Sequence, residues 1–271
     1  MNPKTFDIPD ELWTMIEGIL PPDIATGRGG RPPTSNYRIM CGVLYRLRTG
    51  CQWRAVPERF GTGPTLHRRF QQWVKLGIFN DIFEICLRFY DELRGIDWTW
   101  MSLDASAVKA PKGGSFTGRN PTDRGKIGVK RHILTDGHGV PISITVSAAN
   151  VHDSKMLEET VDAVPLRRGR GVKRPKNLCL DKAYDSRRVE TCLKAKGISP
   201  HIRRRGEPPL MHFPRSKKRR WKVERANSWH NMWRGLKTRW EKHGANYLAC
   251  VMIASACIAF QQATDGFSGM F

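Results

Sequence analysis

The chain has 271 residues, and its 46 Lys and Arg against 25 Asp and Glu give a formal net charge of +21. This excess of positive charge argues against a neutral metabolic enzyme. It predicts a polyanionic partner, with nucleic acid as the first candidate and an anionic membrane surface as the second. The length allows one large domain or two smaller ones. A basic protein without such a partner is the simpler alternative.

Neither the start of the chain nor its cysteines indicate secretion. The first residues, "MNPKTFDIPDELW", lack the basic region and apolar run of a signal peptide. The apolar stretch 247–260 is shorter than the roughly 20 residues of a membrane-spanning helix, so we expect a buried terminal helix and no membrane association. The seven cysteines include no Cys-x-x-Cys pair and lie mostly among apolar residues, which is typical of core side chains in a reducing cytoplasm.

The first 95 residues are predicted to be helical. Apolar side chains recur at helical spacing, and we expect helices over 7–20, over 36–49, from about 64 onwards, and over 79–94. Asp10 is the expected N-cap of the first helix. The Pro- and Gly-rich segment between the first two helices is expected to be a loop that exposes Arg28 and Arg31.

The segment around the third predicted helix has the pattern of a helix-turn-helix DNA reader. Its apolar residues are spaced to face a core, while His67, Arg68 and Arg69 are expected to face outwards. Exposed residues early in such a helix can reach base edges, and neighbouring Arg and Lys hold phosphates. A basic surface on an ordinary helical domain is an equally good interpretation.

Beyond residue 95 the pattern changes to alternating strands and helices. We expect three strands in succession, two of them joined by a turn at 136–139. The remaining elements are expected in the order helix 152–165, strand 176–184, helix 186–197, strand 198–204 and helix 221–243, with a flexible basic loop over 203–222. This order predicts an α/β (α+β) layer with a mixed sheet.

Three acids occupy comparable places in this pattern. Asp104 lies late in the first strand, Asp181 ends the strand "NLCL", and Glu224 begins the last long helix. Hard divalent cations prefer oxygen ligands, and a pair of such ions can promote phosphodiester chemistry. Clustered acids in so basic a chain therefore indicate a metal site that acts on a nucleic-acid backbone.

Each acid also has a structural interpretation. Glu224 can favour the dipole of its helix, and an Asp at a strand end is commonly a turn former. Asp153 and Asp185 are expected to be helix N-caps. Glu241, near the end of the last predicted helix, is a rival third acid.

Several blocks of the sequence resemble the transposases of IS5-type insertion sequences, within the IS4-like DDE group. The N-terminal block is "LYRLRTGCQWRAVPERFGTGPTLHRRFQQWVKLGIF", and the later blocks are "DASAVKA", "GVKRHILTDGHGVPISITVSAANVHDS", "LDKAYDS" and "WKVERANSW". The resemblance implies a ribonuclease H-like fold in which Asp104, Asp181 and Glu224 are the catalytic and metal-binding triad. It also implies Mg²⁺ or Mn²⁺ as cofactor, two ions in number.

The match departs from the family signature around the third acid. Arg220, four residues before Glu224, fits the signature. Lys217 stands where the family has Tyr, and Asn231 stands where it has Lys. These departures put the detail of end binding in doubt and leave the triad unchanged.

Basic residues near these blocks are candidate DNA contacts, with solvated or acid-paired side chains as the alternative interpretation. Beyond the five in the N-terminal region, which are Arg28, Arg31, His67, Arg68 and Arg69, they are Lys109, Lys130, Arg131, Lys182, Arg220, Arg225, Arg234 and Lys237. We expect structural roles for His132 and His152. Trp229 and Trp233 are expected in the core, with stacking on an unpaired base as the alternative.

The sequence therefore predicts a helical DNA-binding domain over 1–95 and a ribonuclease H-like DDE catalytic domain over 96–271. The expected activity is metal-dependent cleavage of insertion-sequence ends and strand transfer into target DNA. The expected partner is double-stranded DNA, bound by a homodimer or larger assembly in the bacterial cytoplasm at the nucleoid. A domesticated DNA nuclease and a non-enzymatic DNA-binding protein are the alternatives.

Overall fold

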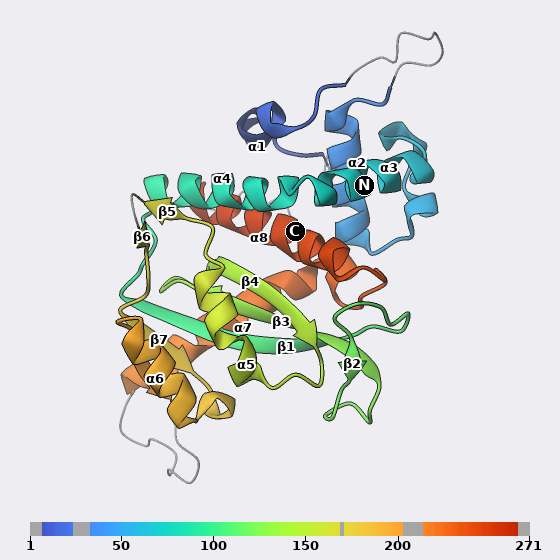
Figure 1. Ribbon diagram of the computed structural model, residues 1–271. Helices are drawn as coiled ribbons and strands as arrows, with labels where there is room; N and C mark the ends of the chain where they lie inside the picture. Colours follow the sequence, from blue (N-terminus) through green and yellow to red (C-terminus); the bar gives the residue numbers. More distant parts are fainter. Residues whose placement is uncertain (1–6, 24–32, 169–170, 203–213, 265–271) are drawn as a thin grey trace.

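A computed structural model describes residues 7–23, 33–168, 171–202 and 214–264 (Figure 1). Arg28 and Arg31 lie outside the described residues. In the helix that begins at Pro214, the side chains are described from Lys222 onwards.

The N-terminal region is helical, as predicted. The structure contains α1 (Asp10–Ile16), η2 (Glu17–Ile19), α2 (Asn36–Thr49), η3 (Trp53–Ala55), η4 (Glu58–Phe60), α3 (Gly63–Lys75) and α4 (Ile78–Leu93). The prediction that Asp10 is the N-cap is wrong, because Pro9 occupies that position and Asp10 is the first helical residue. An acid in the first turn still favours the helix dipole.

Helix α2 shows how local sequence sets the boundaries of an element. Ser35 precedes it, and its hydroxyl accepts a hydrogen bond from the Arg38 backbone N–H at 3.4 Å. Gly50 ends it with a left-handed φ of 71°, a conformation that glycine adopts without strain. The face between these caps buries Met40, Leu44 and Leu47.

The second half of the chain builds a mixed sheet. Its strands are β1 (Trp100–Lys109), β2 (Gly118–Arg119), β3 (Ile127–Thr135), β4 (Pro141–Ala148), β7 (Asn177–Leu180) and β8 (Ser199–Ile202). Strand β3 pairs antiparallel with both β1 and β4, whereas β1, β7 and β8 run parallel to one another. An antiparallel meander followed by parallel strands is the arrangement of the ribonuclease H-like fold, so the predicted fold class is confirmed. A small hairpin of β5 (Arg167–Arg168) and β6 (Gly171–Val172) was not predicted.

Helices cover both faces of the sheet. Figure 1 shows α5 (Asp153–Asp162) in front of the strands and α7 (Pro214–Met232) behind them. The short η5 (Lys182–Tyr184) and α6 (Arg187–Ala195) connect β7 to β8. These connections are the helix–strand alternation that the sequence predicts.

Helix α8 (Gly244–Ala263) lies between α4 and the sheet. By length and composition it could cross a membrane, but 83% of its most apolar window is buried inside the protein. Phe260 stacks on Phe89 of α4 with ring centroids 5.5 Å apart. The expected buried terminal helix is confirmed, and through it the N-terminal helices and the sheet share one hydrophobic core.

The last predicted helix differs from the structure at both ends. Helix α7 begins at Pro214, inside the segment expected to be a flexible loop, and ends at Met232 instead of residue 243. It ends there because the chain turns through η6 (Arg234–Leu236), which buries Trp233 and Leu236 beside α2.

Two predicted caps are also wrong by one residue. His152 caps α5 by accepting a hydrogen bond from the Ser154 N–H, and Asp153 is the first helical residue. Ser186, rather than Asp185, caps α6 by accepting from the Val189 N–H at 3.4 Å. A Ser side chain at that position reaches the same orphan donors as an Asp.

Candidate active site

The register of two parallel strands brings Asp104 and Asp181 to the same level of the sheet. In the β1–β7 pair, Ser102 lies opposite Cys179. Two residues further along each strand are Asp104, still within β1, and Asp181, just after β7. Because side chains alternate with a period of two, both acids continue the face of that aligned pair. Both side chains are half-buried.

The end of β7 is fixed by Asp181 itself. Its Oδ1 atom accepts a hydrogen bond from the Ala183 N–H at 2.8 Å and caps η5. The carboxylate is thus oriented by the backbone of the turn that follows it.

Tyr184, at the end of η5, is a polar residue of this region that sequence reasoning missed. Its side chain is buried, and its hydroxyl has no hydrogen-bond partner among the described residues. Burial raises the pKa of Tyr184 well above its ordinary value, and the charges of Asp153, Asp104 and Asp181 raise it further. The phenol therefore lies close to several carboxylates. In the sequence, the only sign of this role is that Tyr184 follows the strand-end acid Asp181 by three positions.

Glu224 lies on α7, which crosses β1, β3 and β7. Val223, Ala226 and His230 form the buried side of this helix, and Glu224 is exposed. Asn231 follows Glu224 by seven residues, so both lie on one side of the helix. Asn231 accepts a hydrogen bond from Arg131 of β3 at 3.1 Å. The Glu224 side of α7 is therefore a side that reaches the sheet.

Among the described residues, no group of three or more His, Cys, Asp or Glu side chains lies close enough together to hold a metal ion. The structure aligns Asp104 with Asp181 and does not bring Glu224 into a group of three with them.

The rival acid Glu241 has a structural partner. It forms an ion pair with Arg46 of α2 at 2.5 Å, and the two side chains are only 6% and 8% exposed. The Arg46 guanidinium also lies 4.8 Å from the centroid of the Trp53 ring. Glu241 thus joins the N-terminal helices to the segment before α8.

Of the three residues predicted to reach DNA from α3, only Arg68 is exposed. His67 stacks on Trp53 at 5.3 Å, and burial lowers its pKa. Arg69 binds Asp23 at 3.3 Å and also donates to Asn36.

The basic residues around the sheet divide into inner and outer ones. Arg131 is fully buried, and Lys130 binds Asp153 at 2.7 Å. Arg225 is half-buried, with its guanidinium 4.7 Å from the centroid of Trp229. The Arg220 side chain lies outside the described residues, and the exposed candidates are Lys109, Lys182, Arg234 and Lys237.

The histidines and tryptophans with expected structural roles do not all lie in the core, because His152 is exposed. His132 is buried, with Nε2 2.8 Å from the Ser147 hydroxyl, and burial lowers its pKa to about 4. His152 caps α5. Trp233 is buried, and Trp229 is half-buried.

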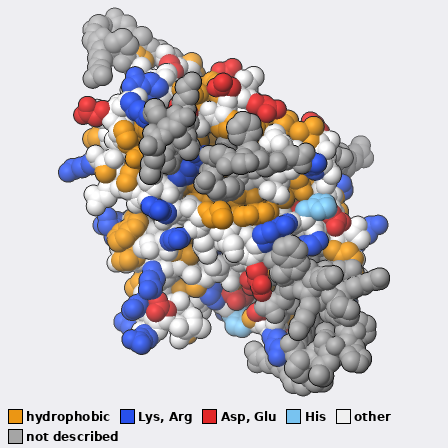
Figure 2. Space-filling view, turned by 180° about the vertical axis from the view of Figure 1, so that it is seen from behind, with side chains coloured by type: hydrophobic (Ala, Val, Ile, Leu, Met, Phe, Trp, Pro, Cys, Tyr) orange, Lys and Arg blue, Asp and Glu red, His pale blue; other side chains and the backbone are white. Residues whose placement is uncertain are grey.

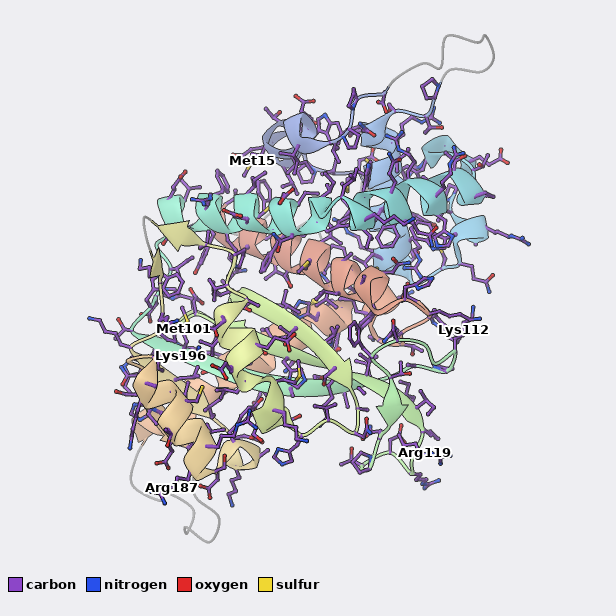
Figure 3. All side chains as sticks on the ribbon, in the orientation of Figure 1. Met15, Met101, Lys112, Arg119, Arg187 and Lys196 are labelled. Carbon is purple, nitrogen blue, oxygen red and sulfur yellow. The ribbon has the colours of Figure 1, made fainter. Side chains whose placement is uncertain are left out.

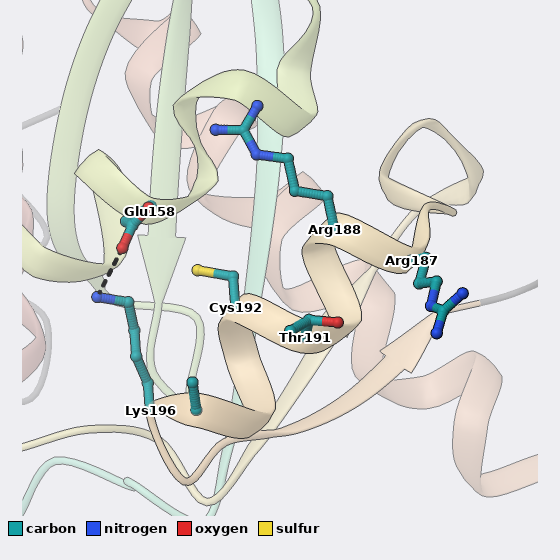
Figure 4. A pocket seen from close by; sticks show the side chains of 7 residues that line it. Glu158, Arg187, Arg188, Thr191, Cys192 and Lys196 are labelled. Atoms are coloured by element: carbon teal, nitrogen blue, oxygen red, sulfur yellow. Dashed lines mark ion pairs between the residues drawn. The ribbon is translucent and has the colours of Figure 1, made fainter.

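The hollow between α5 and α6 is not lined by the candidate acids. Figure 4 shows it with the Glu158–Lys196 ion pair of 3.2 Å at one side and Arg187 and Arg188 at the other. Lys196 also binds Asp162 at 2.6 Å, so its charge is shared between two acids.

Comparisons with known proteins match most of the chain. A family model described as "Putative transposase of IS4/5 family" matches residues 8–83, and one described as "Transposase DDE domain" matches residues 100–259. The protein named "Putative transposase for insertion sequence element IS402", from Burkholderia cepacia, is 40% identical over 145 residues, covering 51% of this chain and 67% of that protein.

Two further similarities concern a second relative and a solved structure. "Insertion element IS402 uncharacterized 16.2 kDa protein", also from Burkholderia cepacia, is 35% identical over 118 residues, which cover 42% of this chain and 80% of that protein. Among solved structures, the piggyBac transposase synaptic complex with hairpin DNA aligns with a TM-score of 0.40 and 14% identity, over 97% of this chain and 73% of that one.

Proposed function

Because the chain belongs to the IS4/IS5-type DDE transposases, we propose that it cuts DNA at the ends of an insertion sequence and joins the cut ends to target DNA. Asp104, Asp181 and Glu224 are the proposed catalytic acids. The observation that carries this assignment is the β1–β7 register, which aligns Asp104 and Asp181 on neighbouring parallel strands.

The donor set suits a hard divalent cation. Carboxylate oxygens are the ligands that Mg²⁺ and Mn²⁺ prefer. The β1–β7 register places Asp104 and Asp181 level with each other, as two ligands of one ion require, and Glu224 lies on the side of α7 that reaches the sheet. Two such ions would activate the attacking oxygen and stabilise the leaving oxygen of a phosphodiester.

The residues of the chain itself orient the acids. The Ala183 N–H fixes one oxygen of Asp181, and a ligand held by a further hydrogen bond is positioned before the metal arrives. Met101 and Leu103 anchor β1 in the core on either side of Ser102. The half-buried acids thus project from a rigid part of the sheet.

The exposed basic residues support binding to the DNA backbone. Figure 2 shows Lys and Arg side chains spread over the face opposite to that of Figure 1. Neutralising phosphates with these side chains releases counterions and supplies affinity that does not depend on sequence. We assign this role to Arg68 in the helical domain over 1–95, and to Lys109, Lys182, Arg234 and Lys237 in the catalytic domain over 96–271. The active form is proposed to be a cytoplasmic homodimer or larger assembly on DNA.

The assignment is tested with charge-neutral variants of the acids. Asp104→Asn, Asp181→Asn and Glu224→Gln are expected to bind an insertion-sequence end normally and to fail to nick it in Mg²⁺ or Mn²⁺. Asp185→Asn is the matched control, because it removes a charge four residues from Asp181, and it is expected to nick normally. Full cleavage by one of the three acid variants would remove that acid from the triad.

The two alternatives are separated by further measurements on the same protein. A nuclease would cut the DNA end without joining its 3′ end to a second duplex. A non-enzymatic DNA-binding protein would bind DNA but show no heat of Mn²⁺ binding by calorimetry. Joining together with metal binding excludes both.

A further inference from the structure

Two segments far apart in the sequence form one surface at the end of β1. The first, residues 110–126, connects β1 to β3 and includes β2. The second, residues 237–243, connects η6 to α8. The Arg239 N–H donates to the Lys109 carbonyl at 2.8 Å, and the Ser115 N–H donates to the Lys242 carbonyl at 3.0 Å. We call this surface the terminal strip.

A buried arginine ties the two segments together. Arg239 is fully buried, and its guanidinium donates to the Ser115 carbonyl at 2.6 Å and to the Lys242 carbonyl at 3.1 Å. It also donates to the carbonyls of Phe116 and Glu241 at 3.4 Å and 2.8 Å. A planar fork with several donors can cross-link carbonyls in this way, which a lysine ammonium matches poorly.

Close backbone packing makes the terminal strip rigid as well. Gly114 has a φ of 111°, and a Cβ there would collide with the Lys242 carbonyl. Gly244 has no room for a Cβ because the Phe116 ring lies against it. The loop conformation is therefore fixed by its partner segment.

This rigid surface exposes two aromatic rings. Phe116 is 56% exposed and Trp240 is 46% exposed. Phe116 also has a φ of 58°, which is rare for an aromatic residue and costs about 1 kcal/mol or more. A strained backbone that holds an aromatic ring in solvent indicates a surface that contacts a partner.

The charges around the rings are almost all positive. The exposed cations of the terminal strip are Lys112, Arg119, Arg124, Lys126, Lys237 and Lys242. Its acid Asp123 already lies 3.9 Å from both Lys109 and Lys126, and its other acid, Glu241, is buried against Arg46. Figure 3 shows Lys112 and Arg119 on the same edge of the molecule. The Lys112 Nζ lies 5.9 Å from the centroid of the Trp240 ring.

We propose that the terminal strip binds single-stranded DNA, with bases stacked on Phe116 and Trp240 and phosphates bound by the surrounding Lys and Arg side chains. Exposed aromatic rings within a cationic surface are how proteins hold unpaired strands, because every base presents a π face and every linkage a charge. This inference rests on the proposed function in that it takes DNA as the partner. It adds a contact for a strand that is unpaired near the cut.

The test measures binding in EDTA, so that it does not depend on cleavage. Fluorescence anisotropy of a labelled oligothymidylate and of a labelled duplex gives the two affinities separately. Trp240→Ala and Phe116→Asn are expected to weaken oligothymidylate binding by about five- to hundredfold each, and to change duplex binding by less than about twofold. Asn adopts the left-handed φ of residue 116 readily, so Phe116→Asn removes the ring and keeps the backbone.

Two kinds of control accompany these variants. Leu76→Ala, just after α3, and Leu93→Ala, at the end of α4, remove exposed apolar side chains outside the terminal strip, with 54% and 56% exposure, and are expected to leave both affinities unchanged. Trp240→Phe and Phe116→Trp keep a ring and are expected to retain most of the oligothymidylate affinity. Unchanged melting temperatures establish that the variants are folded.

Three outcomes would overturn the proposal. The first is unchanged oligothymidylate binding in both ring-deleting variants. The second is equal weakening of duplex and single strand, which would make the terminal strip a general phosphate surface. The third is loss of self-association in the sedimentation of Trp240→Ala, which would make it an interface between copies. Each outcome leaves the cleavage test of the acids unaffected, so the two proposals fail separately.

Discussion

Glu241→Gln is expected to destabilise the protein strongly, because it leaves the Arg46 guanidinium buried without its ionic partner. The two groups are 2.5 Å apart, with 8% and 6% of their side chains exposed. Arg46 already has a buried Nε without a hydrogen-bond partner among the described residues. Breaking a buried pair by removing one member typically costs about 3–5 kcal/mol.

This loss is large compared with the usual total stability of about 5–15 kcal/mol. For a chain of this size, each kcal/mol shifts the melting temperature by roughly 2–4 °C, so we expect a fall on the order of 10 °C. Differential scanning calorimetry and urea unfolding measure the two quantities. Glu84→Gln is the matched control. Its pair with Arg88 is also 2.5 Å long, but its side chains are 29% and 48% exposed, so a change of less than about 1 kcal/mol is expected.

A double variant separates lost charge pairing from lost packing. Replacing a buried ion pair by apolar residues of similar volume is often neutral or stabilising. Arg46→Met combined with Glu241→Leu is therefore expected to recover most of the stability and to cleave DNA normally. A melting temperature of Glu241→Gln within about 1 °C of the wild type would refute the reasoning from burial. Loss of cleavage in a stable double variant would make Glu241, and not Glu224, the third acid.

Two further predictions concern buried polar groups near the sheet. Burial lowers the pKa of His132 in the folded protein to about 4, from 6.5. As the pH falls, His132 is therefore protonated in the unfolded chain before it is protonated in the folded protein. The stability contributed by neutral His132 is complete above pH 6.5 and is lost progressively down to pH 4, by about 3 kcal/mol in total. The free energy of unfolding, measured with urea, should depend less steeply on pH in His132→Gln than in the wild type between pH 6.5 and pH 4. Equal slopes for the two proteins would contradict a low pKa for His132. Tyr184→Phe removes a buried hydroxyl that has no partner among the described residues. It is expected to raise the free energy of unfolding, measured by calorimetry, by about 1 kcal/mol. A fall in that free energy of similar size would show that the hydroxyl has a partner.

Helices and strands could be predicted from the sequence where the apolar periodicity of their own segment is clear. Helix α2 follows from its apolar stripe, its Ser35 cap and its terminal Gly50, all of which lie within the segment itself. The expectation that Asp104 lies late in its strand is wrong, because β1 runs on to Lys109. The pairing of β1 with β7 follows from simple topology, and its register places Asp104, in the middle of β1, level with Asp181 just after β7. These features depend on local sequence or on simple topology.

Features that depend on distant partners could not be predicted in this way. Arg131 carries a charge that is typical of surface residues, but its side chain is fully buried and donates to Asn231 of α7. Arg69 reaches residues 46 and 33 positions away in the chain. The end of α7 at Met232 depends on Trp233 finding a buried site beside α2. None of these contacts leaves a periodic signal in the sequence.

Residues 239–241 of the terminal strip connect it to the core. Arg239 and Glu241 turn inwards, to the carbonyls of the strip and to Arg46 respectively, while Trp240 between them is 46% exposed. This alternation is that of an extended chain, in which successive side chains point to opposite sides. The inward residues join the sheet to the N-terminal helices, so the exposed ring is fixed by the same contacts that stabilise the core. A partner bound at Trp240 would therefore be held in a fixed position relative to both β1 and α2.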